Sequence, residues 1–321
     1  MNIRRIGVGV ALVVASATFA SAAGADGLPV LGVDVGASGV AAPSGSVRYV
    51  TIPAPGGTQV ERIQRAGGRV LSARFLTGTF TIPAVAYDGS ASGLSGDRRT
   101  LVLIEPRRSF PRTTTSLLVL HAIDLADRSL VKLHGDFSFD AVSPDGSRLY
   151  LIQYLSPTDP TRYAVRSFDV GAMQLEPKPI VDPREPGESM RGNPLSRAAS
   201  ADGRWAYTLY DGGGARPFVH ALDTAHATAR CIDIDGLAPA IVSRLRLRMG
   251  DGGRAVQITD GARSRAVLDT RTFAVSAPPT GGSSRDLPLL GLLAAGVASG
   301  ALVALWLLRR RRPVRAPIPV D

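Results

Sequence analysis

The sequence is poor in the residues that mark disulfide-bonded domains and metal sites. One cysteine, Cys231, occurs in 321 residues, so the chain forms no internal disulfide. Its four histidines show neither His-x-x-x-His nor Glu-x-x-His spacing, and no Gly-x-Ser-x-Gly turn or phosphate-binding loop occurs. The sequence therefore predicts no catalytic residue, no metal site and no cofactor.

Lysine is almost absent, and the positive charge lies mainly at the two ends. Only Lys132 and Lys178 stand among 37 basic residues, and the formal net charge is +10. Seven arginines lie in residues 4–5 and 309–315, which leaves residues 24–286 with a net charge of +4. No basic run with interleaved aromatics occurs there, so no nucleic-acid partner is expected.

Long apolar runs are also confined to the ends. Residues 1–23 combine Arg4 and Arg5, an apolar stretch from Ile6 to Phe19, and a final group of small residues. This order predicts a secretory signal peptide, with the mature chain beginning near Ala23. The arginine pair leaves twin-arginine export as an alternative, and the lack of a nearby cysteine excludes a lipoprotein anchor.

The C-terminal run, Leu287 to Leu308, holds 22 residues without a charge. At about 1.5 Å per residue it spans roughly 33 Å, enough to cross a bilayer, although a buried core helix is the alternative. Four arginines follow from Arg309 and place the 309–321 tail in the cytoplasm. We therefore expect a single-pass protein of the cell membrane, contacting the lipid bilayer through 287–308, with residues 280–286 as a linker and the body outside.

Two further features lie in this C-terminal segment. The pentapeptide Leu287-Pro288-Leu289-Leu290-Gly291 before the apolar run and arginines resembles a sortase sorting signal, but Leu290 replaces the threonine of that motif, which argues against cleavage. Gly296 and Gly300 form a Gly-x-x-x-Gly pair, a spacing that lets two helices approach and offers a homodimer contact.

The body contains a repeat of about 50 residues. Ser143-Pro144-Asp145-Gly146 precedes a β-rich segment at Leu149, and Ser200-Ala201-Asp202-Gly203 precedes another at Trp205. Weaker copies begin at Ala42, Ser95 and Gly250. In such a turn Asp caps the backbone and Gly accepts positive φ. A second strand ending in Asp follows each of the last four copies; the aspartates are Asp124, Asp169, Asp223 and Asp269.

These turns followed by Tyr or Trp, and the later strand-Asp-turn, resemble the blades of the WD40-like and YVTN-type β-propellers of secreted bacterial proteins. The resemblance covers residues 28–279 and implies an all-β propeller of about five four-stranded blades, with four or six as alternatives. An innermost first strand is expected at Leu28 to Val35, and ring closure requires the first and last blades to meet. An open array of β-sandwiches is the competing architecture.

Several polar and aromatic residues have a structural and a functional interpretation. Repeated aromatics are expected to pack between blades; they are Tyr49, Tyr150, Tyr207 and Trp205. His121 and His220 occupy equivalent blade positions, which disfavours a shared metal. Cys231 is expected to be a small buried residue. Asp233 and Asp235 occupy alternate positions, so both are expected on one face of a strand, where they could form a cation site with Asp202 or Asp211. Solvated carboxylates of a strand face and of turns are the preferred interpretation.

The segment from Pro177 to Pro194 is the longest interruption of the repeat, and functional residues concentrate in such loops. We name it a candidate interaction loop; its candidate residues are Arg184, Glu185, Glu188, Met190 and Arg191. The first functional hypothesis is a non-enzymatic extracytoplasmic module that binds or scaffolds a protein, peptide or glycan. The alternative is a hydrolase or lactonase with a site in the central channel, because some propellers with similar repeats carry one.

Overall fold

The computed structural model describes residues 39–187 and 190–278. The chain divides into a first unit, Met1–Ser276, and a second, Ala277–Asp321, so nearly all described residues belong to the first. The expected signal peptide, the Leu28 to Val35 strand and residues 280–321 lie outside the described residues. Within the described part, no helix is both long and apolar enough to span a membrane.

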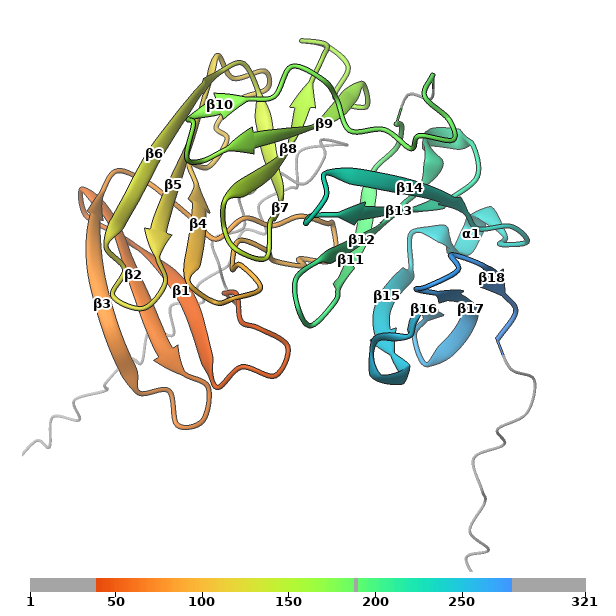
Figure 1. Cartoon of the computed structure of the whole chain (residues 1–321), viewed down its shortest axis with the longest axis horizontal. Coiled ribbons are helices and arrows are strands. Elements are labelled where there is room, and N and C mark those ends of the chain that lie inside the picture. The colour runs from red at the N-terminus through yellow and green to blue at the C-terminus, as the bar shows by residue number, and fades with distance from the viewer. Residues whose placement is uncertain (1–38, 188–189, 279–321) are drawn as a thin grey trace, which may run out of the picture. The chain divides into compact units, whose positions relative to one another are not determined.

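The described chain is all-β apart from one short α-helix and two 3₁₀ turns, which are α1 (Pro239–Val242), η1 (Gly212–Gly214) and η2 (Asp251–Gly253). The strands form five antiparallel sheets that follow one another along the chain (Figure 1). Sheet 1 contains β1 (Val47–Ala54), β2 (Gly57–Gln64) and β3 (Val70–Thr77). Sheet 2 contains β4 (Thr100–Ile104), β5 (Thr114–His121) and β6 (Asp127–His134).

The remaining three sheets have four strands each. Sheet 3 contains β7 (Phe137–Val142), β8 (Arg148–Tyr154), β9 (Tyr163–Asp169) and β10 (Gln174–Leu175). Sheet 4 contains β11 (Pro194–Ala199), β12 (Trp205–Tyr210), β13 (Phe218–Asp223) and β14 (Thr228–Asp233). Sheet 5 contains β15 (Leu245–Gly250), β16 (Ala255–Asp260), β17 (Arg263–Asp269) and β18 (Val275–Ser276).

Each sheet corresponds to one predicted repeat unit, because the repeated turn always precedes the second strand position. In sheets 3, 4 and 5 a regular first strand comes before that turn. In sheet 1 the first position is represented by a bridge from Val40 to Tyr49, and in sheet 2 by bridges from Leu94 to Leu101 and from Thr81 to Ile104. The prediction of four strands per unit is therefore confirmed for three units. In the first two units only three regular strands form, and isolated bridges take the place of the first strand.

Four hydrophobic clusters join each sheet to the next, so sheets 2, 3 and 4 bury both faces. Among the described residues, no cluster joins sheet 1 to sheet 5. The predicted blade-packing role of the repeated aromatics is confirmed, because Tyr49, Tyr150 and Tyr207 are buried within three of these clusters. Trp205 packs at 5.3 Å from Phe273, measured between ring centroids.

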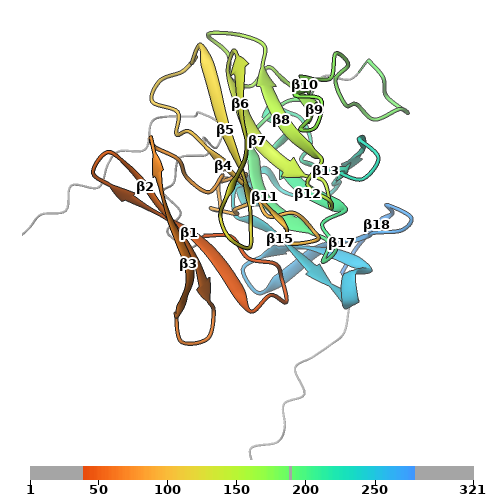
Figure 2. The same ribbon diagram turned by 60° about the vertical axis from the view of Figure 1, so that its left-hand side comes forward.

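Side chains join the first strands of sheets 3, 4 and 5 to one another. A buried ion pair joins Arg197 of β11 to Asp140 of β7, and the Leu247 N–H of β15 donates to Ser196 Oγ of β11 at 2.9 Å. Five meandering sheets packed face to face around their first strands have the architecture of β-propeller blades. The predicted all-β propeller architecture and its five units are confirmed, whereas the expected meeting of the first and last blades is not seen in the hydrophobic clusters of the described residues. Figure 2 shows the sheets from a second direction, with β1, β2 and β3 forming a twisted sheet at one end of the series.

Candidate functional site

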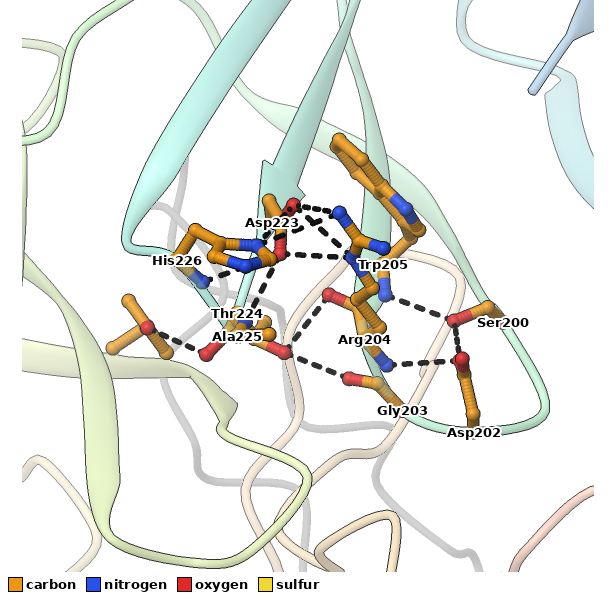
Figure 3. A network of polar contacts seen from close by, with 10 residues as sticks. Ser200, Asp202, Gly203, Arg204, Trp205, Asp223, Thr224, Ala225 and His226 are labelled. Carbon is orange, nitrogen blue, oxygen red and sulfur yellow. Dashed lines mark hydrogen bonds and ion pairs between the residues drawn. The ribbon is translucent and has the colours of Figure 1, made fainter. Parts of the chain in front are cut away.

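The repeated Ser-x-Asp turns, in which Gly146 and Gly203 follow the aspartate in sheets 3 and 4 and Arg98 does so in sheet 2, are hydrogen-bonded in the same way in these three sheets. In sheet 4 the Ser200 hydroxyl donates to Asp202 at 2.5 Å, while the Arg204 N–H donates to the same carboxylate and the Trp205 N–H donates to Ser200 Oγ (Figure 3). This bond from Ser200 is the main reason why the pKa of Asp202 is lowered. Equivalent bonds surround Asp97 and Asp145. These carboxylates stabilise turns and are occupied by the protein itself.

The aspartate that ends the third strand of sheet 4 organises a second network beside this turn (Figure 3). Asp223 is buried and accepts from Arg204 at 2.8 Å and from the His226 ring at 3.0 Å. The adjacent Thr224 hydroxyl donates to the Gly203 carbonyl, and the Thr224 carbonyl accepts from the buried Tyr150 hydroxyl of sheet 3 at 2.7 Å. The network therefore links two blades and is a structural feature of the repeat.

The centre of the sheets contains buried charge but little space. Asp136 accepts from Arg107 at 2.6 Å, and Arg107 also donates to Ser138, whose hydroxyl lies 3.0 Å from that of Tyr154. The adjoining cavity, lined by Ser138, Asp140 and Tyr154 among others, has a volume of about 20 Å³. That volume holds about one water molecule. This cavity is therefore too small to hold a substrate.

His220 of sheet 4 is buried, whereas His121, its equivalent in sheet 2, is exposed. The His220 ring packs edge-on against Tyr210, with ring centroids 6.4 Å apart. Burial removes the imidazolium from water and lowers the pKa of His220 to about 4. The two equivalent histidines thus have different environments, as expected for residues without a shared role.

We expect the free energy of unfolding to fall by about 2 kcal/mol between pH 7 and pH 5. Below pH 6.5 the unfolded chain protonates His220 but the folded chain does not, so stability is lost as pH decreases toward the folded pKa of about 4. Urea denaturation at a series of pH values measures this slope, and His220→Gln should remove it. An unchanged slope in the variant would assign the pH dependence to other groups.

The candidate interaction loop is anchored to the sheets at two points. The Ile180 N–H donates to the Val165 carbonyl of β9 at 2.8 Å, and the Asp182 side chain is 0% exposed. Asp182 accepts from Arg184 and from the Cys231 N–H of β14. Burial opposes ionisation, but these hydrogen bonds outweigh it and lower the pKa of Asp182 to about 2. The loop is therefore held against sheets 3 and 4.

The structure separates the five predicted loop residues. Arg184 helps to anchor the loop through Asp182 and the Cys231 carbonyl, and Glu185 is exposed in a turn. Met190 is half-buried against the cluster between sheets 3 and 4, and Glu188 lies outside the described residues. Arg191 is exposed, has no ion-pair partner among the described residues and lines a hollow of about 720 Å³.

This hollow is one of two that lie on either side of the η1 turn of sheet 4. Both are lined by Gly214, Ala215 and Arg216, so they share a rim. Arg191 and Phe218 line the larger hollow, whereas the second, of about 480 Å³, is mainly apolar; its apolar residues include Leu195, Pro217, Ile234, Leu237, Pro239 and Val242. We call the two hollows together the sheet 4 groove. Sequence reasoning missed its apolar half, since the segment after Asp233 gave no functional signal.

The rim of the sheet 4 groove is fixed by Asp211. Its carboxylate accepts from the Asn193 backbone at 2.8 Å, from the Asn193 amide at 2.8 Å and from the Gly213 N–H at 2.9 Å. A Cβ on Gly192 would lie 2.2 Å from the same carboxylate, which explains the glycine. Arg216 on the rim pairs with Asp235 at 2.9 Å, and both side chains are exposed. The groove thus has a hydrogen-bonded rim that carries exposed charged side chains.

The carboxylates considered for a cation site do not come together. Asp202 and Asp211 are occupied by backbone and amide donors, and Asp235 pairs with Arg216. Asp233 and Asp235 are both exposed, on alternate positions as predicted, but β14 ends at Asp233. No group of three or more potential metal ligands occurs among the described residues. Cys231, which was expected to be buried, is half-buried and packs against the hydrophobic cluster between sheets 3 and 4.

No family model and no curated protein matches this chain. Similar solved structures include hydrazine synthase of Kuenenia stuttgartiensis, with 16% identity, a TM-score of 0.46, and coverage of 80% of this chain and 69% of that chain. TolB from Acinetobacter baumannii has 14% identity and a TM-score of 0.39, over 72% of this chain and 52% of that chain. A structure titled as the Dos1 propeller has 11% identity and a TM-score of 0.43, over 75% of this chain and 57% of that chain. These likenesses are too weak to support any conclusion on activity.

Proposed function

We propose that this protein is a non-enzymatic binding module, held at the outer face of a membrane, whose ligand occupies the sheet 4 groove. The location rests on the expected signal peptide and membrane segment at the two ends of the sequence. The binding role rests on the groove itself, because two adjacent hollows with an anchored rim suit a ligand longer than a single side chain.

The lining of the groove defines the chemistry of this ligand. Arg191, which has no ion-pair partner among the described residues, offers its guanidinium group to a carboxylate, and Arg216 can exchange its exposed ion pair with Asp235 for a ligand carboxylate. Leu237 and Val242 offer apolar contact in the neighbouring hollow. A peptide segment with an acidic residue next to a large apolar residue fits both halves. Among the three ligand classes considered from the sequence, a peptide or extended protein segment is therefore the one we propose.

We expect random peptides selected on the full chain to be enriched in an acidic residue adjacent to an aromatic or aliphatic one. Phage display provides the peptides, and fluorescence anisotropy gives their dissociation constants. Arg191→Ala should weaken binding about tenfold, because a charge-assisted hydrogen bond contributes about 1.5 kcal/mol. Arg216→Ala should act in the same direction, whereas the exposed control Arg271→Ala in sheet 5 should have no effect.

Two results would contradict this function. Selected peptides without acidic residues would show that the guanidinium groups do not recognise the ligand. Peptides that bind Arg191→Ala and Arg216→Ala as tightly as the unaltered chain would place the binding surface elsewhere on the propeller.

A further inference from the structure

Sheet 1 buries one face and leaves the other open to solvent. The buried face, which includes Tyr49, Val60 and Leu76, packs against sheet 2. On the opposite face the strand register aligns Ile52 of β1 with Gln59 of β2, and Gln59 with Phe75 of β3. Sheets 2, 3 and 4 bury both faces against neighbours, so the outer face of sheet 1 is a blade surface without a described partner.

This outer face is apolar. The side chains of Ile52, Val70 and Phe75 are 45%, 49% and 50% exposed, and the same face carries the half-buried Val50 and Ile63. These side chains are interrupted by Gln59 and Glu61 of the middle strand, and together they form an exposed patch of the kind that often has a binding role. The comparable face of sheet 5 has a different character, because Arg246, Arg248 and Gln257 are on it.

Two opposite charges stand on the outer face of sheet 1. Arg48 of β1 is paired in register with Ile63, and Glu61 of β2 with Val50, so the two charged residues lie diagonally on neighbouring strands. Neither has an ion-pair partner among the described residues, and Arg48 Nε is a buried atom without a hydrogen bond. A surface that carries one charge of each sign beside apolar side chains can be complementary to itself under a two-fold rotation.

We propose that the outer face of sheet 1 is the contact surface of a homodimer. Two copies pack these faces together as stacked sheets, with Ile52 and Phe75 on the two strands that flank Gln59. Arg48 of each copy then pairs with Glu61 of the other. This inference is independent of the sheet 4 groove and of the expected Gly296 and Gly300 contact.

The size of the face determines the strength of the contact. Three strands of 8 residues each, at about 3.4 Å per residue and about 4.8 Å between strands, cover about 400 Å² per copy. The resulting total of about 800 Å² is below the roughly 1,200–2,000 Å² of stable complexes. The dimer therefore forms where chains are concentrated, as on a membrane surface, and dissociates in dilute solution.

A charge-exchange experiment tests the proposal in lipid vesicles. Full chains carry a donor or an acceptor fluorophore after Asp321, and all carry Gly296→Leu and Gly300→Leu to remove the expected helix contact. Each of the single variants Arg48→Glu and Glu61→Arg places like charges opposite each other. The apparent affinity of the dimer, measured by energy transfer, should therefore fall about tenfold. An equal mixture of the two variants restores both ion pairs, and transfer should return to within about twofold of the unaltered chain.

A second pair of variants tests the apolar part. Phe75→Asp should abolish energy transfer, whereas Leu155→Asp, at an exposed apolar position after β8, should leave it unchanged. Thermal melts confirm that each variant is folded. A mixture that transfers energy no better than either charge variant alone would overturn the proposal. Equal energy transfer by Phe75→Asp and Leu155→Asp would also overturn it. Both results are expected if the outer face of sheet 1 binds a different partner instead of a second copy.

Discussion

Replacing Asp136 by alanine should lower the free energy of unfolding by about 3–5 kcal/mol. The side chains of Arg107 and Asp136 are only 2% and 3% exposed, and the same carboxylate accepts from the Arg112 backbone N–H at 2.9 Å. Without Asp136, two buried guanidinium groups lose their counter-ion, and an uncompensated buried charge costs more than the ion pair contributes. Burial and the neighbouring Arg107 already lower the pKa of Arg112 to about 10.

Urea denaturation of the full chain in detergent measures this effect. The matched control is Asp235→Ala, which removes an ion pair to Arg216 whose side chains are 68% and 73% exposed, for Arg216 and Asp235 respectively. Solvent screening limits such pairs, so the control should change stability by less than about 1 kcal/mol. Equal effects of the two substitutions would show that the central charges are more solvated than their burial implies.

The second large effect is expected at Gly96, where turns of different blades meet. A Cβ at Gly96 would lie 1.9 Å from the Asp202 carbonyl oxygen, and the neighbouring Asp97 N–H donates to the Pro144 carbonyl at 2.8 Å. The turns of sheets 2, 3 and 4 thus touch through their backbones. Because backbone cannot move aside as a side chain does, Gly96→Ala should cost about 3–4 kcal/mol, at the upper end of overpacking.

Gly171→Ala is the matched control for this glycine. Neither position requires positive φ, and a Cβ at Gly171 would come no closer than 3.4 Å to an Asp169 side-chain oxygen. The control should therefore leave the melting temperature within about 2 °C, since surface substitutions change stability little. If Gly96→Ala melts as the control does, the contact between the turns is looser than the structure indicates.

The repeat was predictable because its signals are local. A Ser-x-Asp-Gly turn is stabilised by bonds within five residues, as the Ser200, Asp202 and Trp205 contacts show, so it can be recognised in the sequence without knowledge of the fold. The blade count and the packing of Tyr150 and Tyr207 followed from the spacing of those turns. The reduced first strands of sheets 1 and 2 could not be predicted, because their bridges depend on partners supplied by the fold.

The candidate functional site, in contrast, was mostly not predictable from the sequence. The sequence indicated a loop but not its contacts, and Arg184, predicted for recognition, is used to anchor Asp182. Asp182 and Cys231 are 49 residues apart, and no local pattern predicts that a loop carboxylate accepts from a strand of the next blade. The apolar half of the groove arises from Leu195 of sheet 4 and from residues of connecting segments, chiefly the one between sheets 4 and 5, that are unremarkable in sequence.

By itself, the sequence determined the repeat unit, the five turns and the near-neutral charge of the body, because these depend on composition or on neighbours along the chain; the signal peptide and the membrane segment stay predictions. Only the tertiary structure decided which polar groups are buried in pairs, as with Arg107 and Asp136, and which blade face is left open, as on sheet 1. Burial and pairing are properties of residues brought together from distant positions, and the free energy of a charge or an apolar side chain depends on that environment.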